Sequence, residues 1–216
     1  MLKTKNKYDS FGLHAYGAYA PVDRVNLIGT LSWMHNSSDI TQSINAAGFN
    51  KADADVKTNL FSLGARAEAN LPVGKANVIP HAGLRYVWAK SGSYDTKVDG
   101  KKVWGNTPDA TNTFQLPIGV AVRGDIMTVS GWNVRPQADL TFIPQFGDTE
   151  QKTKLSNFNG VSDKLSGEFA GKFGTSVNLG VQADKGPTTF GVRYGFTAGT
   201  KGKADHAFKF EYRYRF

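Results

Sequence analysis

The sequence predicts an all-β fold, an antiparallel transmembrane β-barrel, and three observations support this prediction. Hydrophobic and polar residues alternate with a period of two, which is the pattern of a strand with two unlike faces. The alternating segments run for roughly 10–14 residues, whereas soluble strands have a mode of about 5–6 and membrane strands need about 9–11. Short turns also alternate with long polar loops, as they do in outer-membrane barrels.

The C-terminal segment shows the alternation most clearly. Aromatic residues occupy every second position, and charged residues occupy the positions between them. The aromatic set is Phe208, Phe210, Tyr212, Tyr214 and Phe216. The charged set is Lys209, Glu211, Arg213 and Arg215. A helix would mix these two sets on every face, so the segment is a strand.

Eight further segments carry the same pattern, which makes about nine strands in all. They are residues 8–20, 24–35, 60–71, 77–89, 113–123, 132–143, 169–182 and 188–198. The short turns are expected at 21–24, 71–76, 124–131 and 183–187, and the polar loops at 36–56, 90–112, 147–167 and 199–205. Short connections at one rim and long ones at the other are typical of a membrane barrel.

A soluble β-sandwich or barrel would show a similar alternation, with its apolar face turned inward. Here the apolar face is rich in aromatic residues and carries no charge along the nine segments. The opposite face mixes Gly, Ser, Thr and Asn with Arg, Lys and Glu, as the wall of a water-filled lumen would. This difference favours a barrel that faces lipid.

Charged residues on the polar face are expected to line the lumen. They are Arg66, Glu68, Arg85, Arg123, Arg135, Asp139, Lys172, Arg193, Lys209, Glu211, Arg213 and Arg215. Nine are basic and three are acidic, so the surplus behind the net charge of +8 is spread over the strands rather than gathered into a nucleic-acid-binding patch. Ion pairs within this face are the alternative role, and Arg66–Glu68, Arg135–Asp139 and Glu211–Arg213 are the expected pairs.

Several kinds of chemistry find no support in the sequence. There is no cysteine, which excludes disulfides, thiolate zinc sites and thiol catalysis. The four histidines are too far apart for a local metal motif, so neither a metal nor a cofactor is expected. His35, Ser37, Ser38 and Asp39 form the one compact set that could host hydrolysis. A polar loop is the more common explanation of such a set, and we expect no enzyme.

Strand parity bears on whether the barrel can close. Bacterial barrels have an even number of strands, and a nine-stranded sheet would leave two unpaired edges in lipid. Either residues 1–216 are one barrel domain that is incomplete at its N-terminus, or the first segment does not cross and eight strands close.

Four stretches resemble the β-domains of autotransporters (type V secretion). They are residues 8–19, 59–68, 79–86 and 212–216, and the likeness in pattern extends over the chain. Members of this family have twelve strands, so the resemblance implies that the chain holds strands four to twelve. It also implies a Gram-negative outer membrane, a non-enzymatic role in exporting and anchoring a covalently linked N-terminal passenger absent from this sequence, and a monomer in contact with lipid.

The aromatic C-terminal strand also resembles the signal by which the barrel-assembly machinery recognises its substrates. This resemblance implies an assembly role for the aromatic set that ends at Phe216. The alternative is that Phe216 is only an aromatic residue of the membrane interface. The alternative function is that of a small eight-stranded barrel of the opacity or OmpA-like kind, serving adhesion, structure or a narrow anion pore.

Overall fold

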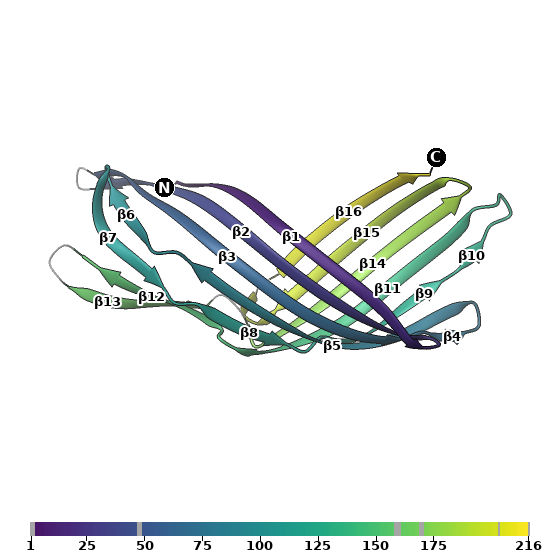
Figure 1. The fold of residues 1–216 in the computed structure, drawn as a ribbon. Coiled ribbons are helices and arrows are strands. Elements are labelled where there is room, and N and C mark those ends of the chain that lie inside the picture. The colour runs from purple at the N-terminus through teal and green to yellow at the C-terminus, as the bar shows by residue number, and fades with distance from the viewer. Residues whose placement is uncertain (1–2, 47–48, 158–160, 169–170, 203, 216) are drawn as a thin grey trace.

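The computed structural model describes residues 3–46, 49–157, 161–168, 171–202 and 204–215. Over these residues the chain forms one antiparallel sheet of sixteen strands and a single turn of 3₁₀ helix, η1 (Thr200–Gly202). The strands are β1 (Thr4–Val22), β2 (Val25–Ala46), β3 (Phe49–Ala69), β4 (Leu71–Val73), β5 (Ala76–Ser91), β6 (Tyr94–Val98), β7 (Lys101–Pro108), β8 (Thr111–Gln115), β9 (Ile118–Gly124), β10 (Ile126–Met127), β11 (Asn133–Gly147), β12 (Glu150–Ser156), β13 (Ser162–Glu168), β14 (Phe173–Lys185), β15 (Thr188–Gly199) and β16 (Ala204–Tyr214). The sheet is strongly curved and twisted (Figure 1).

Nine wall segments make up the main body of the sheet and pair with one another in chain order. They are β1, β2, β3, β5, the pair β8 and β9, β11, β14, β15 and β16. They correspond to the nine segments of the hydrophobic alternation, although the structure has sixteen strands rather than about nine. One extra strand arises because Pro117, which has no N–H to donate, separates β8 from β9.

The expectation of long irregular loops at 36–56, 90–112 and 147–167 is wrong, because these stretches are largely strand. β2 and β3 stay paired from Val25↔Ala69 to Ala46↔Phe49. β6 pairs with β7, and β12 pairs with β13. β6 also pairs with β3 and β7 with β12, so the hairpins form a side sheet that continues one end of the wall (Figure 1). Hydrophobic alternation does not reveal these strands, because most side chains on both their faces are polar. Backbone hydrogen bonds hold the strands, and these bonds do not depend on the side-chain pattern.

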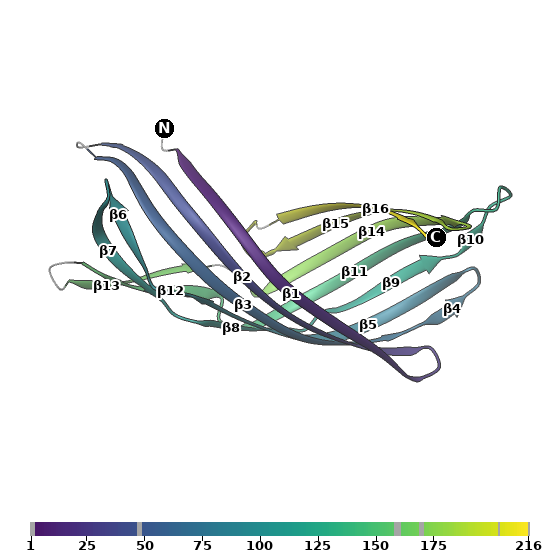
Figure 2. The same cartoon turned by 45° about the horizontal axis from the view of Figure 1, so that its top comes forward.

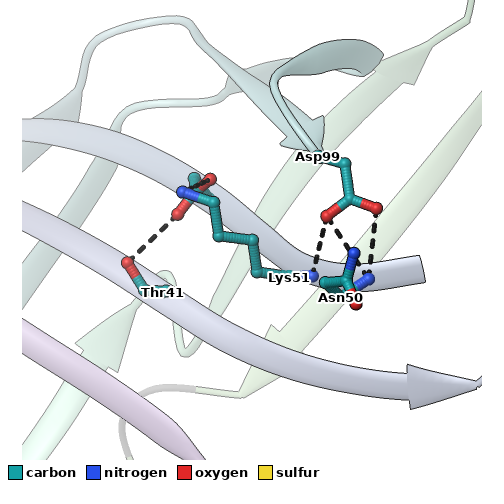
Figure 3. A network of polar contacts seen from close by, with 5 residues as sticks. Thr41, Asn50, Lys51 and Asp99 are labelled. Atoms are coloured by element: carbon teal, nitrogen blue, oxygen red, sulfur yellow. Dashed lines mark hydrogen bonds and ion pairs between the residues drawn. The ribbon is translucent and has the colours of Figure 1, made fainter.

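A tight turn holds the β6–β7 hairpin on β3. Asp99 and Gly100 both have positive φ, 47° and 81°, as the Asp-Gly sequence favours in a two-residue hairpin turn. The Asp99 carboxylate accepts hydrogen bonds from the backbone N–H groups of Asn50 and Lys51, each at 3.1 Å (Figure 3). The turn is therefore fastened to the backbone of a strand almost fifty residues away.

A second contact lies beside this turn on β3. The Lys51 ammonium is 3.0 Å from a carboxylate oxygen of Asp53, and the Thr41 hydroxyl donates to the other oxygen at 3.1 Å (Figure 3). The hydrogen bond from Lys51, followed by that from Thr41, holds the pKa of the Asp53 carboxyl below its ordinary value of 3.8. The paired β2–β3 hairpin thus favours the ionised form of Asp53.

The two outermost wall segments each have one partner. β1 pairs only with β2 and β16 only with β15, and no backbone pairing joins β1 to β16 within the described ranges. Figure 2 shows β1 and β16 as separate borders of the curved sheet. Within the described residues, backbone pairing does not close the sheet into a ring. The strand expected at 169–182 begins at Phe173, and Phe169 lies outside the described residues.

Candidate functional site

The two faces of the wall differ in chemistry, and the register keeps each face uniform from strand to strand. On one face Leu31 lies opposite Leu63, and Leu63 lies opposite Tyr86. On the other face Asp139 lies opposite Asn178. We call these the apolar face and the polar face.

Exposure to the surroundings is inverted relative to a soluble protein. The apolar face holds exposed large side chains, such as Leu63 at 53% and Phe210 at 61% of full exposure. The polar face holds buried ones, such as Ser62 at 3% and His81 at 4%. Within the described residues Ile79 is the one hydrophobic side chain classed as buried, and it too lies on the polar face. The polar side chains are therefore the crowded ones, and the hydrophobic ones face outward.

The register places ten of the twelve charged residues on the polar face, which is where the alternation predicts them. They are Arg66, Glu68, Arg85, Arg123, Arg135, Asp139, Arg193, Lys209, Glu211 and Arg213. Lys172 lies in a bend just before β14, and Arg215 follows the end of β16, so neither belongs to a paired strand. The backbone N–H of Arg215 donates to the carbonyl of Pro187 at 3.0 Å. That these residues line a lumen stays a prediction.

Two of the three expected ion pairs are present, and one is wrong. Arg66 lies 3.2 Å from Glu68, and Arg213 lies 2.9 Å from Glu211. Arg135 does not pair with Asp139. Four residues along a strand span about 13 Å at about 3.3 Å per residue, which is too far for a contact. Arg135 pairs instead with Asp184 of the neighbouring strand β14.

Asp139 has another partner, which the sequence analysis missed. His81 Nε2 lies 2.8 Å from a carboxylate oxygen of Asp139, and the Thr141 hydroxyl donates to the other oxygen at 2.7 Å. β9 runs between the strands of these residues, and Gly119 on β9 lies opposite His81 on one side and Thr141 on the other. A Cβ at Gly119 would lie 2.6 Å from His81 Cε1, so the bridge requires glycine there. The one sequence signal of this bridge is that His81 and Gly119 each occupy the polar face of a predicted strand, on two strands that are neighbours in the chain.

The aromatic set of the last strand lies on the apolar face of an edge strand. Phe208, Phe210, Tyr212 and Tyr214 are all exposed. Phe216 lies outside the described residues. One edge of β16 pairs with β15, and within the described ranges no strand covers the other edge.

The candidate hydrolase set is divided between the two faces. His35 Nδ1 lies 2.9 Å from Asn59 Oδ1 on one face, whereas the Ser38 hydroxyl donates to Asn6 Oδ1 at 2.6 Å on the other. Alternation along β2 turns Ser37 and Asp39 to the His35 side, away from Ser38. Among the described residues, no three His, Asp or Glu side chains lie close enough to hold a metal ion. No helix of the described part is long and apolar enough to span a membrane.

Comparison with known proteins gives a family and a fold. Residues 2–195 match the autotransporter beta-domain family. The fold is similar to the β-domain of the Bordetella autotransporter BrkA, with a TM-score of 0.68 and 17% identity over 98% of this chain and 75% of that chain. No curated protein matches the sequence closely enough to count as a relative.

Two further solved structures are less similar. The transport unit of the Escherichia coli autotransporter AIDA-I matches with a TM-score of 0.36 and 10% identity, over 100% of this chain and 86% of that chain. The ferric yersiniabactin uptake receptor FyuA of Yersinia pestis matches with 0.41 and 10%, over 90% and 36%. The family match covers most of the chain, and the sheet has the fold of a solved autotransporter β-domain. The chain therefore belongs to the autotransporter beta-domain family.

Proposed function

We propose that the chain is a non-enzymatic translocator and anchor of the bacterial outer membrane, which helps to export and display a passenger linked to its N-terminus. The inverted exposure of the two faces carries this proposal. Hydrophobic side chains that face outward from a sheet this large need an apolar surrounding, and a lipid bilayer supplies it. The buried polar face can then offer water and hydrogen-bonding groups to a polypeptide.

The lengths of the strands agree with a membrane wall that carries an extension. β2 has 22 residues and β3 has 21, about twice the 9–11 that a tilted strand needs to cross. The excess lies at the same end as the β6–β7 and β12–β13 hairpins (Figure 1). On this proposal that end stands outside the bilayer, at the cell surface, and the tight turns lie at the periplasmic rim.

The open borders of the sheet have a consequence in lipid. An unpaired backbone N–H or C=O in hydrocarbon costs several kcal/mol. We therefore expect the free edges of β1 and β16 to be paired in the membrane, either with each other or with further strands, to give a closed monomeric barrel. Before insertion, the free edge of β16 and its aromatic row offer the barrel-assembly machinery a strand to capture by strand addition.

Fractionation of cells that carry the chain with an N-terminal epitope tests the proposal. We expect the protein in the outer membrane of a Gram-negative host, and the epitope open to protease added to intact cells. The control carries Leu63→Arg and Leu179→Arg, two charges on the apolar face, and should fail to insert. A protein that stays soluble without detergent would overturn the membrane assignment. Insertion with the epitope left inside would overturn the export role alone.

A further inference from the structure

One row of the polar face concentrates positive charge. Arg123 on β9 lies opposite Gln137 on β11, which lies opposite Gly180 on β14. Gly180 in turn lies opposite Arg193 on β15, which lies opposite Lys209 on β16. Like charges directly across a strand pair, such as Arg193 and Lys209, destabilise a sheet unless something compensates them.

The carboxylates of the neighbouring rows do not supply that compensation. Glu68 pairs with Arg66, Asp139 with His81, Asp184 with Arg135, and Glu211 with Arg213. Each acid is thus already engaged by a different base. Arg123, Arg193 and Lys209 form no ion pair within the described residues. Asp139 borders a neighbouring hollow together with Arg123 and Arg193, but His81 and Thr141 already engage its carboxylate.

The side chains of this row meet over a hollow. A Cβ at Gly180 would lie 2.8 Å from Gln137 Nε2 and 3.1 Å from Arg193 Cγ, so both side chains lean across the glycine from opposite sides. The hollow has a volume of about 220 Å³ and is lined by Arg123, Arg135, Gln137, Gln182 and Arg193. Its lining is rich in N–H donors and contains no acidic side chain. The Nε of Arg135 is buried and has no acceptor in the described structure.

From this arrangement we propose that the hollow is an oxyanion-binding site, in which Arg123, Arg193 and the amide of Gln137 hold a carboxylate or phosphate group. Guanidinium groups bind such groups through two parallel N–H donors, which gives the site a preference over chloride. The anion separates the charges of Arg193 and Lys209. The site needs only water access to the polar face and does not depend on the export function. The oxyanion can be a free ion or the acidic side chain of a polypeptide that occupies this face.

Calorimetric titration of the full chain, folded in detergent, tests the site with two probes. One probe is inorganic phosphate, and the other is a short glutamate-rich peptide, with its lysine-rich counterpart as the negative control. We expect saturable binding of at least one oxyanion probe. Arg193→Gln and Arg123→Gln should each weaken it by about tenfold or more, because each removes charged hydrogen bonds. Binding of phosphate alone identifies a free-ion site, and binding of the peptide alone identifies a polypeptide site.

Arg85→Gln is the matched control, since it removes the same charge from the same face but outside the row. It should change the affinity by less than about twofold, as expected of a residue that shares no partner with the site. Equal weakening by Arg85→Gln would show a diffuse field and overturn the proposal, as would the absence of saturable binding of both probes. Arg193→Gln relieves a repulsion and should fold, which its far-ultraviolet circular dichroism will show. The oxyanion probe that binds should raise the unfolding temperature of the unmodified chain, and it should raise that of Arg193→Gln by less at the same concentration.

Discussion

Replacement of Gly119 by alanine would place a methyl group in a crowded part of the polar face. The new Cβ would lie 2.4 Å from the carbonyl oxygen of Leu140, 2.6 Å from His81 Cε1 and 2.8 Å from Thr141 Oγ1. Carbon atoms do not approach other heavy atoms so closely. Either strand β9 or the His81 ring must move, and this movement would weaken the 2.8 Å contact between His81 and Asp139.

Two terms set the size of the effect of Gly119→Ala. Overpacking of a crowded site costs about 1–3 kcal/mol. Loss of the partner of a buried polar group costs about 1–3 kcal/mol more. We expect the free energy of unfolding to fall by about 2–6 kcal/mol, measured by urea titration in detergent micelles with tryptophan fluorescence as the signal.

Gly191→Ala is the matched control for this substitution. Gly191 lies on the same face in β15, and the nearest atoms to a new Cβ there are 3.5 Å and 4.0 Å away, which is ordinary contact. This variant should be neutral or more stable by about 0.4–1 kcal/mol, because alanine restricts the unfolded chain. In a His81→Ala background, Gly119→Ala should cost less, since the ring is gone. Equal stability of the two alanine variants, or no coupling to His81, would refute the packing argument.

Three further predictions concern the faces, the hairpin and the last strand. Leu179→Arg should lower the free energy of unfolding in lipid vesicles, measured by urea titration, by about 2–4 kcal/mol. Asn178→Arg is the control on the polar face and should change it by less than about 1 kcal/mol. Similar losses for the two variants would contradict the assignment of faces. The pKa of Asp53 is lowered in the folded β2–β3 hairpin, so its carboxylate stabilises that hairpin at a pH above the ordinary pKa of 3.8. This contribution is lost as the pH falls through the lowered pKa. Protease cleavage at the hairpin tip should rise in that acidic range in the unmodified chain and be independent of pH there in Asp53→Asn. Phe210→Ser should slow assembly into the outer membrane of cells more than Phe190→Ser, a matched change on the same face of β15. Both variants should refold equally well in detergent. Equal assembly rates would show that the last strand carries no assembly signal.

The period of the hydrophobic pattern was enough to identify both faces of the wall. In β16 the aromatic residues from Phe208 to Tyr214 lie on one face, and Lys209, Glu211 and Arg213 lie on the other, as the alternation predicts. A strand turns successive side chains to opposite sides whatever its neighbours are, so this information is local. For the same reason the contacts between residues two apart, Arg66–Glu68 and Glu211–Arg213, could be predicted.

Contacts between strands could not be predicted in this way, because they depend on which residues the register brings together. Asp139 meets His81, 58 residues away, across a glycine on the strand between them, and Arg135 meets Asp184, 49 residues away. The row that joins Arg123 to Lys209 exists only once five strands are aligned. Backbone pairing also builds the β6–β7 and β12–β13 hairpins from sequence that predicts polar loops. The pattern of side chains indicates which face of the sheet each residue occupies. Register and curvature depend on backbone hydrogen bonds, which every residue type except proline can both donate and accept.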